Sequence, residues 1–285
     1  MRTIATVCLG GDLADKLEAI AAAGFEGVEI YAPDLVQSRL TEKRIGRLAR
    51  ELGLRVVCLQ PLKDFEGHCD PEQRGERLKR SFETMDALGT ELLLIASNTD
   101  RMASANPERR LDDLGAAAEF ASAHDKRIGF EALAWGDQVC DYRQAWEIVR
   151  RLDHPQFGLV LDSFHPLARN EPLELMATLP AERIFLVQLA DAPRREVFLD
   201  SGDDELCKRQ LLDWSRHARR FPGEGELALE PFYAAIAAID YRGPLSIETF
   251  NDRYSAHPAA DVAKQAAKAL DGAITRIDAL RKEHR

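Results

Sequence analysis

The sequence predicts a single (β/α)8 barrel, because short apolar runs alternate with amphipathic stretches along the chain. Eight β-favouring runs are separated by stretches with helical periodicity, and most runs are apolar almost throughout, which is typical of parallel strands covered on both faces. Repeat units of roughly 35 residues fit an eightfold barrel of about 250 residues, and the chain has 285 residues. The alternative, a doubly wound sheet, usually has a glycine-rich turn after its first strand, but this chain contains neither GxGxxG nor a Walker sequence.

The expected elements follow one another in regular order. We expect strands at residues 4–9, 27–31, 55–60, 91–97, 127–133, 157–162, 183–190 and 244–250. We expect helices at residues 12–23, 35–52, 71–88, 107–124, 141–152, 171–179, 229–239 and 258–282. Three helix ends are marked by a glycine that precedes a strand, at Gly24, Gly53 and Gly89. Three helix starts are marked by a proline, at Pro71, Pro107 and Pro258.

One connection between expected elements is much longer than the others. Residues 191–226, after the seventh expected strand, are expected to form a long loop. Long loops in compact domains are usually functional or disordered, and this one follows a strand on the face where barrel enzymes carry their active sites. No linker or low-complexity segment divides the chain. We therefore expect one catalytic domain over residues 1–285, without a second domain after the last helix.

The composition argues against several classes of partner. Lys and Arg number 38 against 48 Asp and Glu, a formal net charge of −10, and the basic residues form only short scattered pairs such as Arg219-Arg220. Nucleic acid is therefore an unexpected partner. No apolar run reaches the length of about 18 residues that spans a membrane. The five cysteines form no CxxC pair and the N-terminus lacks a secretory signal, so we expect a cytoplasmic location. The sequence leaves homo-oligomer formation open.

Four polar residues lie within otherwise apolar expected strands, the fifth to the eighth: Glu131, Asp162, Gln188 and Glu248. A buried ionised carboxylate costs several kcal/mol unless it is paired or binds a cation, and the C-terminal ends of barrel strands meet at one mouth. Three carboxylates and one amide oxygen suit Mg²⁺ or Mn²⁺, with Co²⁺ as a substitute and Zn²⁺ less favoured. The alternative is that a buried Arg or Lys neutralises each carboxylate.

At these residues the chain resembles the sugar phosphate isomerase/epimerase-like superfamily of xylose isomerase-like barrels, and more closely the bacterial 3-dehydroshikimate dehydratases. The similar stretches cover nearly the whole chain, at residues 4–7, 24–30, 60–67, 131–136, 142–146, 161–165, 187–193, 214–217, 221–223 and 248–252. Trp-Ser-Arg-His at 214–217 and Phe-Asn-Asp at 250–252 are not general to the superfamily. Two features depart from the closer family: Lys63 replaces a usual arginine, and residues 194–212 form a longer segment.

The resemblance implies one divalent metal ion held by Glu131, Asp162, Gln188 and Glu248. It also implies that the chain is a hydro-lyase that converts 3-dehydroshikimate, a small carboxylate, into protocatechuate and water through a metal-stabilised enolate. An isomerase, epimerase or dehydratase of sugars or inososes is the alternative, because it would use the same metal site. A barrel used only for binding is a third hypothesis, and four intact ligand positions argue against it.

Groups for proton transfer are expected beside the metal ligands. His165 lies three residues after Asp162 and has an ordinary pKa of about 6.5, so it is the leading acid or base. The carboxylates of Glu131 and Glu248 could also take the proton.

Groups that bind the substrate are expected on the surrounding loops. Lys63 and Arg216 form the expected cation pair for the substrate carboxylate, although Lys lacks the bidentate fork of Arg. Further polar contacts are expected from Asn98, Ser215, His217 and Asn251.

Overall fold

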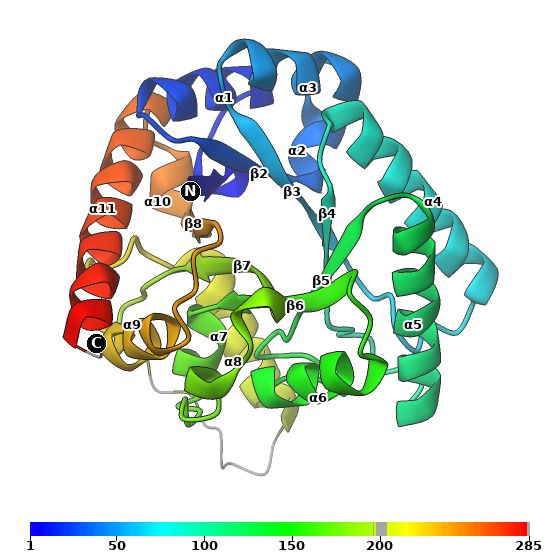
Figure 1. Cartoon of the computed structure of the whole chain (residues 1–285). Coiled ribbons are helices and arrows are strands. Elements are labelled where there is room, and N and C mark those ends of the chain that lie inside the picture. Colours follow the sequence, from blue (N-terminus) through cyan, green and yellow to red (C-terminus); the bar gives the residue numbers. More distant parts are fainter. Residues whose placement is uncertain (196, 198–203, 284–285) are drawn as a thin grey trace.

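The computed structural model describes residues 1–195, 197 and 204–283, in which eight parallel strands close into a barrel (Figure 1). Each strand pairs with its neighbours in sequence, and β1 pairs with β8. The strands are β1 (Arg2–Ala5), β2 (Gly27–Tyr31), β3 (Arg55–Leu62), β4 (Leu92–Ala96), β5 (Arg127–Glu131), β6 (Phe157–Asp162), β7 (Ile184–Leu189) and β8 (Leu245–Ile247). The predicted fold class is confirmed. Residues 196 and 198–203, part of the expected long loop, lie outside the described residues.

Helices surround the barrel on its outer face (Figure 1). The α-helices are α1 (Leu13–Ala22), α2 (Ala32–Gln37), α3 (Glu42–Glu51), α4 (Pro71–Leu88), α5 (Pro107–Ala123), α6 (Tyr142–Leu152), α7 (Phe164–Ala168), α8 (Asp204–His217), α9 (Leu229–Ala238), α10 (Asp252–Ser255) and α11 (Ala259–Glu283). Short 3-10 helices are η1 (Thr6–Cys8), η2 (Met176–Thr178) and η3 (Ala181–Arg183). None of the described helices combines the length and apolar character needed to cross a bilayer.

Two of the expected helices differ in the structure. The helix expected at 35–52 is divided into α2 and α3, because Ser38 has an extended backbone and its Oγ accepts a hydrogen bond from the N–H of Leu40. Such a local side-chain bond competes with helix formation. The helix expected at 171–179 contains only η2, whereas α7 begins directly after β6.

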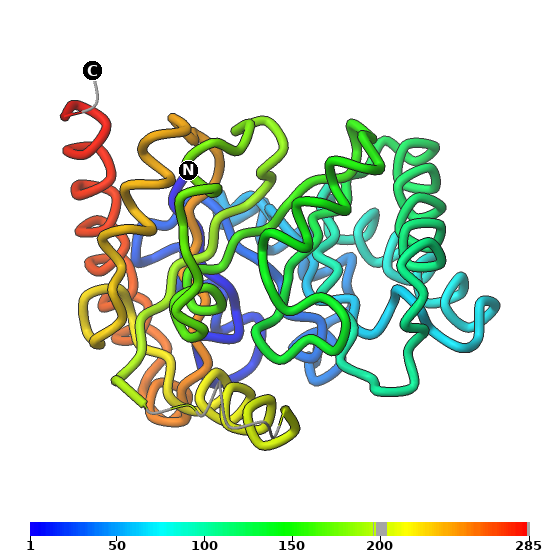
Figure 2. The backbone as a smooth tube through the Cα atoms, turned by 90° about the horizontal axis from the view of Figure 1, so that it is seen from below, coloured from blue at the N-terminus to red at the C-terminus, as the bar shows by residue number. Residues whose placement is uncertain are grey.

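The expected long loop contains a helix that reaches the barrel mouth. Helix α8 occupies residues 204–217 of the 191–226 connection and buries Cys207, Leu211, Trp214 and Ser215. In Figure 2, which shows the molecule from the side, α8 (yellow) lies at one end and the C-terminal end of α11 (red) at the other. Helix α8 therefore brings its C-terminal residues to the face on which the strands end.

Candidate active site

The four polar strand residues meet inside one end of the barrel. Glu131 and Asp162 end β5 and β6, Gln188 is the penultimate residue of β7, and Glu248 directly follows β8 rather than lying within it. Asp162 and Gln188 are partners in register. Each of the four residues is at most 5% exposed. The predicted convergence of these side chains therefore agrees with their placement, while the strand expected at 244–250 is shorter.

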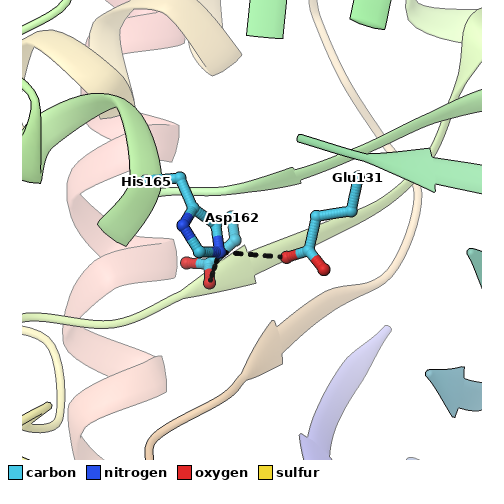
Figure 3. A group of neighbouring side chains, drawn as sticks. All are labelled: Glu131, Asp162 and His165. Carbon is cyan, nitrogen blue, oxygen red and sulfur yellow. Dashed lines mark ion pairs between the residues drawn. The ribbon is translucent and has the colours of Figure 1, made fainter. Parts of the chain in front are cut away.

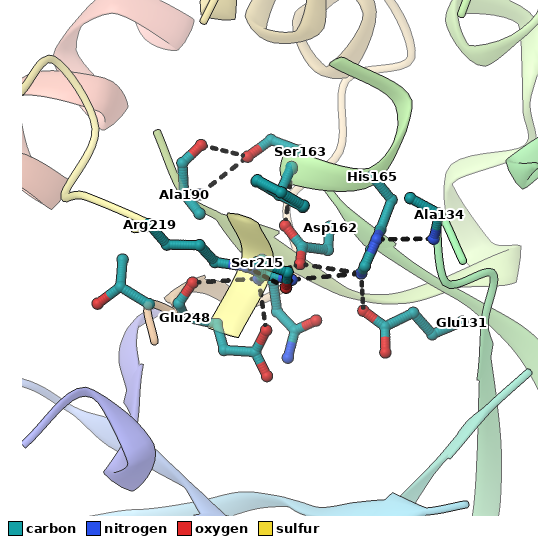
Figure 4. Close-up of polar contacts among 12 residues, drawn as sticks. Glu131, Ala134, Asp162, Ser163, His165, Ala190, Ser215, Arg219 and Glu248 are labelled. Atoms are coloured by element: carbon teal, nitrogen blue, oxygen red, sulfur yellow. Dashed lines mark hydrogen bonds and ion pairs between the residues drawn. The ribbon is translucent and has the colours of Figure 1, made fainter. Parts of the chain in front are cut away.

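A buried arginine that the sequence pattern did not single out lies among these carboxylates (Figure 4). The Nη1 atom of Arg219 is 2.5 Å from Oδ2 of Asp162 and 2.9 Å from Oε2 of Glu248. Arg219 is 1% exposed, and its Nε and Nη2 donate hydrogen bonds to Oγ of Ser215. Asp162 and Glu248 thus have the buried arginine partner that the alternative interpretation requires. Glu131 forms no ion pair with Arg or Lys in the described residues.

The cluster retains an excess of negative charge. When all three carboxylates are ionised, the single guanidinium of Arg219 leaves a net charge of −2. Burial, followed by the charge of Glu248, raises the pKa of Glu131 to about 8, against the opposing effect of Arg219. Burial also raises the pKa of Asp162 to about 6, again opposed by Arg219. One divalent cation would balance this charge and keep the carboxylates ionised.

Two buried oxygens of the cluster accept no hydrogen bond from the described residues: Oε1 of Glu131 and Oε1 of Gln188. The amide of Gln188 donates from Nε2 to Oε2 of Glu29 at 2.8 Å, so its oxygen is free to act as a ligand. Gln60 donates from Nε2 to Oε1 of Glu248 at 2.8 Å. Because unpaired buried oxygens are costly, this donor set fits a hard cation such as Mg²⁺ or Mn²⁺.

His165 lies close to two of the carboxylates, and with them forms a group that could hold a metal ion (Figure 3). Its Nε2 is 3.4 Å from Oε1 of Glu131 and 3.5 Å from Oδ2 of Asp162. However, its Nδ1 accepts a hydrogen bond from the N–H of Ala134 at 2.9 Å. Its Nε2 also lies 3.4 Å from Nη2 of Arg219, so each ring nitrogen faces an N–H donor. Burial lowers the pKa of His165 to about 4, which favours the neutral ring.

The role of His165 as the acid or base beside the metal ligands stays a prediction. A neutral imidazole has one N–H and one lone pair, so it can either donate or accept a proton. The amide oxygen of Gln188 likewise stays the predicted fourth ligand.

The end of α8 and the loop after β3 line a narrow cavity beside the cluster. Lys63, Ser215 and Arg216 border it together with Glu131, His165, Arg219 and Glu248. The guanidinium of Arg216 lies 4.4 Å from the ring centroid of Phe250. Burial, and next the charge of Arg216, lower the pKa of Lys63, which indicates that the two cations are near each other. The structure therefore brings the expected cation pair to the carboxylate cluster.

The other three expected substrate contacts do not border this cavity. The Asn98 side chain donates to the carbonyl of Glu66 and accepts from the N–H of Asp100. Asn251 donates from Nδ2 to the carbonyl of Arg219 and caps α10. His217 pairs through Nδ1 with Oδ2 of Asp252 at 3.0 Å, on the exposed side of α8. These side chains stabilise loops around the mouth, and their contact with the substrate stays a prediction.

The segment that carries Arg219 is held by the carboxylate of Asp191, just beyond β7. Oδ2 of Asp191 accepts from the N–H groups of Gly223 and Gly225, and Oδ1 accepts from that of Leu227. A Cβ atom at Gly225 would lie 2.3 Å from Oδ1 of Asp191, so only glycine allows this close approach. The backbone of Arg220 also pairs with that of Asp191. This turn fixes the conformation of the backbone directly after Arg219.

The barrel and its mouth match a known family. A family model described as xylose isomerase-like TIM barrel matches residues 17–273. The chain belongs to this family. A solved structure described as a xylose isomerase-like TIM barrel/4-hydroxyphenylpyruvate dioxygenase fusion protein has a TM-score of 0.86 and is 42% identical, and the match covers 94% of this chain and 42% of that one. The family match therefore confirms the predicted type of barrel as well as the predicted fold class.

Two curated relatives of this family member share one activity in their names. The 3-dehydroshikimate dehydratase of Pseudomonas aeruginosa is 46% identical, with 95% of this chain and 40% of that protein aligned. The 3-dehydroshikimate dehydratase of Pseudomonas putida is 42% identical, with 94% of this chain and 41% of that protein aligned. The chain thus spans about two fifths of the length of these relatives. The expected resemblance to this group of dehydratases is confirmed.

Proposed function

We propose that this chain is a metal-dependent 3-dehydroshikimate dehydratase, which removes water from 3-dehydroshikimate to give protocatechuate. The observation that carries the proposal is the position of two cations, Lys63 and Arg216, beside a buried cluster of metal-type oxygens. A substrate with a carboxylate at one end and a ketone with a neighbouring hydroxyl at the other suits this arrangement. The identity of 46% to a curated enzyme of this name supports the same substrate.

The proposed metal ligands are Glu131, Asp162, Gln188 and Glu248, with Mg²⁺, Mn²⁺ or Co²⁺ as the ion. A bound divalent cation would act as a Lewis acid on the C3 ketone and so acidify the proton at C4. In this proposal Arg219 keeps Asp162 and Glu248 ionised and oriented for the cation, because it pairs with both. Glu29 orients the amide of Gln188 by accepting its N–H.

The remaining steps are assigned to side chains of this chain. Lys63 and Arg216 bind the substrate carboxylate through charge-assisted hydrogen bonds. Glu131 or Glu248 accepts the proton from C4, and the hydroxyl at C5 leaves with a proton as water. His165 can donate or accept a proton in these steps, because its ring is neutral. Tautomerisation of the product then forms the aromatic ring, so the overall reaction releases one water.

All five cysteines are free, which supports the cytoplasmic location that we propose.

Turnover of 3-dehydroshikimate tests this function directly. We expect the purified chain to form protocatechuate when Mg²⁺, Mn²⁺ or Co²⁺ is supplied, measured by the ultraviolet absorption of the aromatic product. Treatment with a chelator should remove the activity, and addition of the metal should restore it. Absence of product with all three metals, together with turnover of a ketose or inosose, would favour the isomerase alternative.

The cation pair makes a second prediction. We expect Arg216→Gln to raise KM about tenfold to a hundredfold with a smaller change in kcat, because a charge-assisted contact to the carboxylate is lost. Lys63→Gln should behave similarly, whereas Lys63→Arg keeps the charge and should preserve KM. Steady-state kinetics of the three variants measures this. An unchanged KM in both glutamine variants would remove the pair from substrate binding.

A further inference from the structure

A wider pocket adjoins the narrow cavity and opens beside α8. Its volume is about 420 Å³, and it shares Lys63, Leu133, Trp135 and Arg216 with the cavity next to the carboxylate cluster. We call this pocket the vestibule. Because the two spaces share these lining residues, a ligand in the vestibule is next to the proposed site of reaction.

The vestibule is positively charged in a chain of net charge −10. Two carboxylates and five cationic side chains line it, and two further carboxylates, Asp137 and Asp204, pair with Lys208. The local net charge is then +1; the cations are Lys63, Arg101, Lys208, Arg209 and Arg216. A local field of this kind raises the concentration of anions at a pocket.

Three of these cations have no carboxylate partner within 4.0 Å in the part of the chain that the structure describes: Lys63, Arg209 and Arg216. The other two are paired, Arg101 with Glu205 at 3.1 Å and Lys208 with Asp137 at 2.9 Å. The unpaired charges are arranged along one path. Arg209 and Arg216 lie seven residues apart on the same face of α8, with Leu212 between them on the pocket wall.

Unpaired cations near each other repel. Burial and, to a smaller extent, the neighbouring Arg216 lower the pKa of Lys63. An anion between these side chains would relieve the repulsion, and it would do so best where solvent is partly excluded. Arg209 is exposed at the outer end of the row, whereas Arg216 is half-buried at the inner end.

We propose that the vestibule is an anion-binding site in its own right, in which Arg209 and Arg216 attract and hold small carboxylates outside the carboxylate cluster. The proposal rests on the proposed function for the chemical class of the ligand, a carboxylate. It adds Arg209, which borders the vestibule but not the inner cavity, as a residue that strengthens binding of the substrate through its charge.

Benzoate tests this site without any turnover, and benzamide is its uncharged analogue. We expect isothermal titration calorimetry at an ionic strength of about 0.01 M to show benzoate binding to the intact chain. Arg209→Gln should weaken this binding about two- to fivefold, the range for an exposed charge contact, and Arg209→Lys should retain it. The difference should nearly vanish at about 1 M salt, where charges are screened beyond about 3 Å. Arg47→Gln, an exposed arginine on α3, is the matched control.

Each outcome separates this site from the proposed reaction. Arg209→Gln that binds benzoate as tightly as Arg47→Gln would overturn the vestibule site, and so would an equal loss of benzamide binding. Benzoate binding that depends on Arg209, in a chain that does not convert 3-dehydroshikimate with any metal, would support the vestibule and refute the dehydratase. Normal turnover of 3-dehydroshikimate, together with no effect of Arg209→Gln on benzoate binding, would support the dehydratase and refute the vestibule.

Discussion

We expect Glu131→Gln to lower kcat for 3-dehydroshikimate by about a thousandfold or more, while the barrel stays folded. Glutamine keeps the size of the side chain but removes a negative charge from a proposed metal ligand. The oxygen concerned accepts no hydrogen bond from the described residues, so few protein contacts are lost. Loss of Lewis-acid activation is worth several kcal/mol, and each 1.36 kcal/mol is about tenfold in rate.

The measurement needs two readouts beside activity. Metal content after dialysis should fall in Glu131→Gln, and circular dichroism should show an unchanged fold. Glu18→Gln, an exposed glutamate on α1, is the control for loss of one negative charge. Glu248→Gln should resemble Glu131→Gln in activity, but it also disturbs the ion pair with Arg219. Full activity of Glu131→Gln would exclude it from the metal site and from proton transfer.

The second large effect concerns stability. Arg219→Met should lower the free energy of unfolding by about 3–5 kcal/mol in the presence of a chelator, because it leaves the buried carboxylates of Asp162 and Glu248 without their partner. Mn²⁺ should then stabilise the variant more than it stabilises the original chain, since the cation replaces the lost positive charge. Urea unfolding monitored by circular dichroism, with chelator or with Mn²⁺, measures both effects.

The neighbouring arginine supplies the control. The side chain of Arg220 donates only to the carbonyl of Glu224 among the described contacts, so Arg220→Met should change stability much less and should not alter the response to Mn²⁺. Equal stabilisation of Arg219→Met and the original chain by Mn²⁺ would show that the cation binds away from Asp162 and Glu248. A stable Arg219→Met without metal would mean that these carboxylates are already protonated.

The barrel and the carboxylate cluster could be predicted because both depend on strand pattern. Strands buried on two faces are apolar almost throughout, so Glu131 and Gln188 are conspicuous within them. Parallel strands in a closed barrel then bring such residues to one end. Lys63 directly follows β3 and could be predicted near the mouth by the same reasoning, whereas Arg216 lies on α8 and was expected there only from the family resemblance.

Arg219 could not be selected in this way. It lies in the connection between β7 and β8, next to Arg220, and a pair of basic residues in a loop usually indicates a solvated surface. The turn held by Asp191, together with the contacts of the Ala218–Arg219 backbone to Phe250 and Asn251, directs the Arg219 side chain into the barrel. Loop hydrogen bonds likewise decided the positions of Asn98 and Asn251. Backbone turns of this kind leave little periodic pattern in a sequence.

Most polar groups of the site come from two parts of the chain, the strand ends and the connection between β7 and β8. The metal-type oxygens come from strand ends, whereas Ser215, Arg216 and Arg219 come from the end of α8 and the residues directly after it. Because Arg219 pairs with Asp162 and Glu248, an exchange of this connection would change the charge of the proposed metal site together with the substrate contacts, so these two parts of the chain must vary together.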